Sequence, residues 1–142
     1  MDANNPVVKF CQEGMRAEGE GRHDDARALF TQAWEAAKDD YDACVAAHFL
    51  ARHQDSPQDT LHWNQEALAR ALAVGDERVQ RFYPSLYLNM GYSYELLGNQ
   101  EEARKYYDLA AEGANDLPEG QYGDAVRQGI AEGRKRVDSE EE

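Results

Sequence analysis

One pattern of 17 residues occurs twice in the chain. Its first copy, GRHDDARALFTQAWEAA, covers residues 21–37, and its second, GNQEEARKYYDLAAEGA, covers residues 98–114. Both copies begin with Gly, contain Ala-Arg, and carry a ring residue, Phe30 or Tyr107, followed three residues later by Ala. Recurrence at such a distance indicates a chain built from similar units that stack on one another. No other feature limits the possible folds as strongly.

The spacing of apolar residues predicts that these units are helical. From Val7 onward, apolar residues recur three and four positions apart, and no useful stretch alternates at period two. Segments of about four turns are separated by chain breakers. The breakers are Gly19 with Gly21, Asp55-Ser56-Pro57, Gly98-Asn99 and Leu117-Pro118-Glu119-Gly120. We therefore expect an all-α protein.

One proline falls inside a helical pattern. Residues 76–97 read as helix on both sides of Pro84. Either a helix begins near Pro84 after a separate turn, or one long helix continues through the proline with a kink. We favour the kinked helix.

The distance between the two copies suggests the length of the unit. Gly21 and Gly98 are 77 residues apart, which equals two periods of about 34 residues plus nine further residues. This period predicts units at residues 7–40, 41–74 and 84–117, with an extra segment before the third. In the third unit, the positions that govern helix packing hold Tyr87, Met90, Gly91, Tyr94, Ala103, Tyr107 and Ala110. That series resembles the aromatic, Leu, Gly, Tyr, Ala, Phe, Ala series of tetratricopeptide repeats, and the first unit matches it with Phe10, Gly14, Ala26, Phe30 and Ala33.

The resemblance implies a single domain over residues 1–142, in which antiparallel helix pairs stack as a short right-handed superhelix. Small residues at the packing positions let the two helices of a pair approach closely, while rings fill the gaps beside them. An apolar stripe over residues 118–137 predicts a capping helix on the last pair. Residues 138–142 are expected to form an acidic tail.

The middle unit departs from the series at one packing position. It has His48 where the other two units have Gly, and the facing positions of its second helix hold Thr60 and Asn64. A buried imidazole needs hydrogen-bond partners. We therefore expect His48 to be buried and hydrogen-bonded to Thr60 or Asn64.

Composition argues against several classes of function. With 15 Lys and Arg against 28 Asp and Glu, the net charge of −13 disfavours nucleic acid as a ligand. No apolar run approaches the ~20 residues that span a bilayer, and residues 1–6 do not resemble a secretory signal, so we expect no membrane contact and a cytoplasmic location. The two cysteines, Cys11 and Cys44, have no metal-site spacing. We expect neither a metal nor a cofactor, because nucleotide-binding motifs are also missing.

A catalytic role is a distant alternative. Cys44 and His48 stand four residues apart on a predicted helix, which would bring a nucleophile and its base together. Both fall on positions that face the partner helix, where a thiol usually acts as a small hydrophobic group. We therefore expect a protein that is not an enzyme.

The resemblance implies a protein-interaction module. In such families, the first helices of successive repeats line a concave groove that holds a peptide or protein segment. The groove positions that suit binding, which we expect to form one contiguous patch, are Phe49, Arg52, His53, Leu88, Asn89 and Tyr92. The acidic surface favours a basic or apolar partner. The alternative is a self-associating structural protein, a homodimer in which a second copy covers the groove or the outer face of the last helix.

Overall fold

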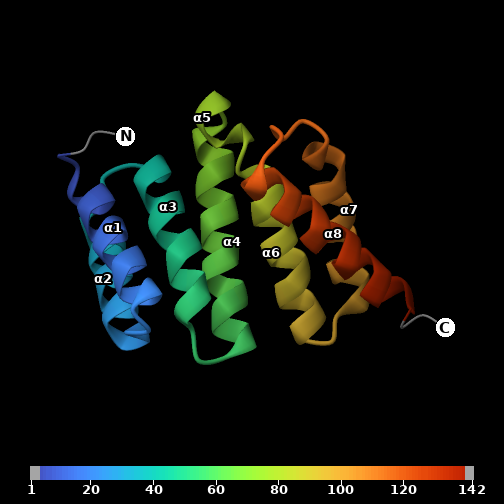
Figure 1. The fold of residues 1–142 in the computed structure, drawn as a ribbon, viewed down its shortest axis with the longest axis horizontal. Coiled ribbons are helices and arrows are strands. Elements are labelled where there is room, and N and C mark those ends of the chain that lie inside the picture. Colours follow the sequence, from blue (N-terminus) through green and yellow to red (C-terminus); the bar gives the residue numbers. More distant parts are fainter. Residues whose placement is uncertain (1–3, 140–142) are drawn as a thin grey trace. The chain divides into compact units, whose positions relative to one another are not determined.

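The computed structural model describes residues 4–139, and the chain is helical throughout that range except at its turns (Figure 1). The described residues form eight α helices and one short 3-10 helix. The chain divides after Val74 into two compact units. None of the helices between residues 4 and 139 combines the length and the apolar character needed to cross a bilayer.

The first unit consists of two antiparallel helix pairs. α1 (Pro6–Gly19) packs along α2 (His23–Ala36), and α3 (Asp40–Leu50) packs along α4 (Pro57–Val74) (Figure 1). The 3-10 helix η1 (Ala51–His53) continues the end of α3. α2 also packs against α3, so the two pairs share one core. That core contains Val7, Cys11, Ala17, Ala26, Phe30, Ala33, Ala46 and Leu50.

Asn5 fixes the beginning of α1 and joins it to α3. Its Oδ1 accepts a hydrogen bond from the Val7 backbone N–H at 2.9 Å, and Pro6 occupies the first helical turn. Its Nδ2 donates to both carboxylate oxygens of Asp42, at 3.1 and 3.2 Å. Asp42 is buried, and this contact satisfies its carboxylate.

The repeated pattern corresponds to the same packing contact in α1–α2 and in α6–α7. A Cβ placed on Gly14 would lie 2.4 Å from the Phe30 ring, and one placed on Gly91 would lie 2.9 Å from the Tyr107 ring. Each glycine therefore lets a fully buried ring of the partner helix lie directly against the helix backbone.

The second unit contains α5 (Glu77–Gln80), α6 (Tyr83–Leu96), α7 (Gln100–Ala114) and α8 (Gln121–Ser139). α6 and α7 form an antiparallel pair, and α8 packs against both of them (Figure 1). Two glycines allow this approach: a Cβ on Gly129 would lie 3.0 Å from Leu88, and one on Gly133 would lie 2.4 Å from Tyr107. The apolar side chains of α8 that complete the core are Val126, Ile130 and Val137. The expected last helix is therefore present, and its apolar stripe covers the α6–α7 pair.

The all-α class and the antiparallel pairs are thus confirmed, while the right-handed stacking stays a prediction. The acidic tail was expected to start at residue 138, but Asp138 belongs to α8 and pairs with Arg104 at 3.5 Å. The rest of the predicted tail, residues 140–142, lies outside the described residues.

The expectation of one long helix kinked at Pro84 is wrong. α5 ends at Gln80, a turn closes with the Phe82 N–H donating to the Val79 carbonyl at 2.9 Å, and α6 begins at Tyr83. Proline has no N–H to donate to the carbonyl four residues earlier, and its ring clashes with that carbonyl. In the first turn of a helix neither defect matters, and that is where Pro84 lies.

The expectation for His48 is also wrong in part. The side chain is half-buried, and its Nδ1 is a buried atom without a hydrogen-bond partner among the described residues. The imidazole instead contacts the ring of Phe49 edge-on, with the centroids 5.6 Å apart.

Candidate binding surface

Three of the predicted binding residues lie together at the end of α3 and in η1. The Phe49 ring stacks on Phe30 of α2, with centroids 4.8 Å apart and planes 7° from parallel. The His53 ring also stacks on Phe30, at 5.5 Å. The Arg52 guanidinium lies over the Phe49 ring, 4.7 Å from its centroid. The structure therefore brings Phe49, Arg52 and His53 into one cluster.

Glu18 of α1 holds the two polar members of this cluster. Its Oε1 lies 2.6 Å from the Arg52 guanidinium, and its Oε2 lies 2.6 Å from His53 Nε2. Because an ionised carboxylate only accepts hydrogen bonds, this contact is a hydrogen bond when His53 has its hydrogen on Nε2. The His53 side chain is only 9% exposed, whereas that of Arg52 is 45% exposed. The guanidinium therefore remains accessible although it is paired.

The prediction of site residues omitted Glu18. Glu18 precedes Arg52 by 34 residues, which is one repeat period, so it occupies the same position on the first helix of the preceding pair. That equivalence was the available signal, because equivalent positions on adjacent first helices lie side by side in a stack of helix pairs.

A depression of about 350 Å³ opens beside this cluster. His23 of α2 contributes a second imidazole, 5.9 Å from the ring of His53. An ion pair between Arg27 and Asp55, at 3.0 Å, forms another part of its lining. The depression is therefore polar and contains side chains of both charges.

The other three predicted residues lie on α6. Tyr92 is 49% exposed, and the Arg136 guanidinium of α8 lies 5.9 Å from its ring centroid. Leu88 is half-buried because it packs against α8 at Gly129. Asn89 is half-buried, and its backbone carbonyl accepts a hydrogen bond from the Ser93 hydroxyl at 2.9 Å. Tyr92 is thus the member of this group that offers most surface to a partner.

Glu95 anchors Arg136 in its position beside Tyr92. The Tyr107 hydroxyl donates to Glu95 Oε1 at 2.6 Å, and Arg136 donates to both carboxylate oxygens at 2.7 and 3.1 Å. Burial of Glu95 raises its pKa, but the hydrogen bonds from Arg136 and Tyr107 outweigh that effect and lower the pKa overall. The carboxylate is therefore ionised at neutral pH and fixes the guanidinium.

Cys44 and His48 do not form an activated pair. Burial raises the pKa of the Cys44 thiol to about 11, so the nucleophilic thiolate is disfavoured. Burial, together with the nearby Arg52 cation, lowers the pKa of His48 to about 4. Within residues 4–139, no group of three or more His, Cys, Asp or Glu side chains is arranged to hold a metal ion.

Comparison with known families identifies one repeat. Residues 84–112 match the tetratricopeptide repeat family, and this range includes both Gly91 and the Tyr107 ring that packs against it. A search of curated proteins found no match to the chain. Residues 7–40 and 41–74 remain predicted repeats. The protein therefore carries a tetratricopeptide repeat at residues 84–112, within a chain whose described part, residues 4–139, is all-helical.

Proposed function

We propose that the protein is a non-catalytic adaptor that binds a peptide or protein segment of a partner on the first helices of its helix pairs. The match of residues 84–112 to the tetratricopeptide repeat family carries this proposal, because such repeats generally serve protein–protein interaction.

The chemistry of the first helices supports binding there. On α1 and α6, Met15 and Tyr92 are 44% and 49% exposed although both are large and apolar or aromatic. On η1, the Arg52 guanidinium supplies an accessible cation beside the Phe49 ring. Exposed aromatic, thioether and guanidinium groups are typical of residues that dominate binding energy. The net charge of −13 favours a basic or apolar partner segment.

Capture of partners from the native host by the immobilised protein tests the role of Tyr92. Tyr92→Ala should weaken capture by ~1 kcal/mol or more, because it removes an exposed ring from the proposed surface. Tyr122→Ala is a matched control, since Tyr122 is 53% exposed in the same unit but lies on α8. Equal capture by both variants and the unaltered protein would place the site elsewhere.

The role of Arg52 requires a charge exchange. Arg52→Glu alone would face Glu18, so any loss of binding could come from the repulsion between the two carboxylates. The double variant Glu18→Arg with Arg52→Glu restores an ion pair of reversed polarity. Weak capture by both variants supports direct contact of Arg52 with the partner, whereas recovery in the double variant shows that the ion pair alone matters.

The molar mass of the purified protein in solution shows whether the surface binds a second copy of the chain or a different protein. Light scattering across a range of concentrations should give the mass of a monomer, 16.0 kDa. A concentration-dependent mass of twice that value, lost in Tyr92→Ala, would assign the surface to self-association instead.

A further inference from the structure

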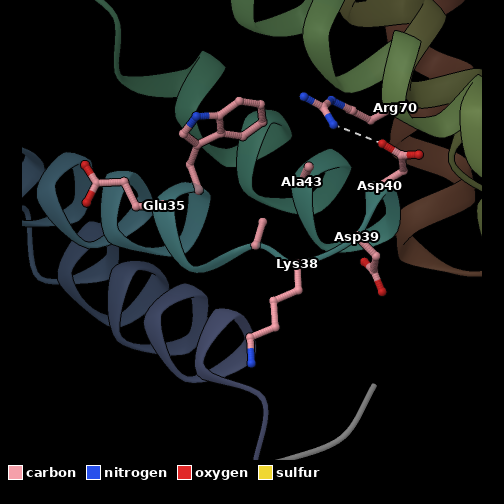
Figure 2. Close-up of a pocket in the computed structure, with 8 residues that line it drawn as sticks. Glu35, Lys38, Asp39, Asp40, Ala43 and Arg70 are labelled. Atoms are coloured by element: carbon pink, nitrogen blue, oxygen red, sulfur yellow. Dashed lines mark hydrogen bonds and ion pairs between the residues drawn. The ribbon is translucent and has the colours of Figure 1, made fainter.

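A second hollow, of about 570 Å³, lies in the first unit where α2 ends and α3 begins (Figure 2). It lies at the opposite end of α3 from Phe49 and Arg52, so it is separate from the surface proposed above. The indole of Trp34 provides its aromatic wall, and Arg70 reaches it from α4. The charged side chains that line it are Glu35, Lys38, Asp39, Asp40 and Arg70.

Arg70 shows how a guanidinium is held in this hollow. Its NH1 donates to Asp40 at 2.9 Å, and its Cζ lies 5.4 Å from the Trp34 ring centroid. A carboxylate at the edge and an indole face are the two groups that bind a guanidinium best. Asp40 is neutralised by this contact (Figure 2).

The remaining charges are not balanced in the same way. The Glu35 carboxylate makes no ion pair or hydrogen bond with the described residues, and the Asp39 carboxylate accepts only the backbone N–H of Asp42, at 2.8 Å. Lys38 is the other cation of the lining, but its side chain extends away from Arg70 and Asp40 (Figure 2), and its ammonium likewise has no partner within residues 4–139. The hollow thus keeps carboxylates that no internal cation neutralises.

The end of α2 adds negative potential on the same side. The last turn of α2 contains no basic residue, and after it the chain is extended at Ala37. The carbonyl groups of a helix C-terminus carry the negative end of the helix dipole and attract cations. The dipole and the free carboxylates therefore favour a positively charged group beside the indole, which already contacts the Arg70 guanidinium at 5.4 Å and the Trp63 ring edge-on at 5.0 Å.

From this arrangement we propose that the hollow is a binding subsite for a basic side chain, arginine or lysine, of a partner protein. The cation is a second one beside Arg70, and the exposed carboxylates of Glu35 and Asp39 in the lining attract it. This subsite recognises charge and does not depend on binding at Tyr92 or Arg52.

The two tryptophans of the chain, Trp34 and Trp63, make a direct test possible. In the full chain labelled with ¹⁵N, their indole N–H groups give two signals, and a Trp63→Phe variant identifies that of Trp34. Titration with the capped peptide acetyl-Gly-Arg-Gly-amide should move the Trp34 signal in a saturable way. The peptide with lysine shows whether an ammonium also binds, and the peptide with citrulline, which has the shape of arginine without its charge, should have no effect.

Charge variants test whether the carboxylates of the hollow are responsible for binding the arginine peptide. Glu35→Lys should weaken the response to the arginine peptide at least about threefold. Asp39→Asn should also weaken it, while asparagine still caps α3. Glu13→Lys is the matched control, because Glu13 is exposed on α1 and the substitution changes the net charge equally. An unmoved Trp34 signal, an equal response to citrulline, or equal affinities of Glu35→Lys and Glu13→Lys would overturn the proposal, whatever the outcome of the capture experiments.

Discussion

Gly14 and Gly91 show how single residues account for the repeated pattern. Each lies on the first helix of a pair, 16 residues before the ring that packs on it, Phe30 or Tyr107. In the middle pair, the same spacing separates His48 from Asn64. There the ring residue belongs to the first helix and the smaller residue to the second. The middle pair therefore reverses the arrangement of the other two.

Substitution of Gly14 tests this packing. Alanine is the better helix former by about 1 kcal/mol, but its Cβ would meet the Phe30 ring at 2.4 Å. Because overpacking costs about 1–3 kcal/mol, Gly14→Ala should lower the free energy of unfolding by about 0–2 kcal/mol in urea titrations, and by about 1–3 kcal/mol relative to a glycine-to-alanine change without a clash. Gly19→Ala in the same helix is the control, since a Cβ there meets nothing within 4 Å. A Gly14→Ala protein as stable as Gly19→Ala would contradict the packing described.

His48 should make stability depend on pH. Its pKa is lowered from 6.5 to about 4, chiefly by burial and then by the Arg52 cation, although the Glu18 carboxylate acts in the opposite direction. Between pH 6.5 and about 4, the His48 imidazole is therefore protonated in the unfolded chain but neutral in the folded chain. The contribution of neutral His48 to the free energy of unfolding is fully present above about pH 6.5 and is lost as the pH falls toward 4.

Thermal unfolding followed by circular dichroism between pH 7 and 4.5 measures this dependence. His48→Gln should reduce the loss of stability over that range by about 1–2 kcal/mol. His62→Gln is the control, because His62 is exposed on α4. The same pH dependence in both variants would show that His48 is not the group responsible.

The sequence can place a residue on a surface, but it cannot show which neighbour that residue contacts. The repeat period predicts that Arg52 and His53 lie on the groove side of a first helix, and in the structure Arg52 lies close to Phe49 and His53 lies close to Phe30. The repeat period does not show that the Glu18 carboxylate contacts both polar side chains, as it does in the structure. That contact depends on the spacing of two adjacent helix pairs, which a periodic pattern does not contain.

At the scale of helices, the pattern of apolar residues predicts helix type well and one boundary poorly. The expected last helix, residues 118–137, is observed as α8, Gln121–Ser139, because its apolar stripe has an α6–α7 face to cover. Around Pro84 the same pattern continues through residues that form a turn. Apolar periodicity reports which face is buried and does not register a missing backbone hydrogen bond, so the break before α6 was not predictable from it.

Removal of α8 should destabilise the second unit. A chain ending at Leu117 lacks Val126, Ile130 and Val137, whose burial contributes about 5 kcal/mol in total. It also lacks Arg136, so Glu95 and Tyr107 lose a hydrogen-bond partner. We expect a lower melting temperature and concentration-dependent aggregation. A chain ending at Ser139 is the control, and a shorter chain that melts like this control as a monomer would show that α8 is not a cap.

At the scale of the whole molecule, each compact unit has its own core. The tryptophans of the chain report on only the first of these units. Trp34 and Trp63 both precede Val74, so tryptophan fluorescence follows the first unit alone. Far-ultraviolet circular dichroism follows the helices of both units. The two signals together therefore test the prediction that residues 1–142 form a single domain.

A single domain requires the two signals to change together in urea. Stacked repeats are coupled to their neighbours, and short arrays unfold as one cooperative transition. We therefore expect the fluorescence and dichroism midpoints to coincide within error. Gly14→Ala sharpens the test because it weakens only the first unit: in a single domain it should lower both midpoints equally. If it lowers the fluorescence midpoint while part of the dichroism transition stays in place, the units unfold separately and the chain contains two domains.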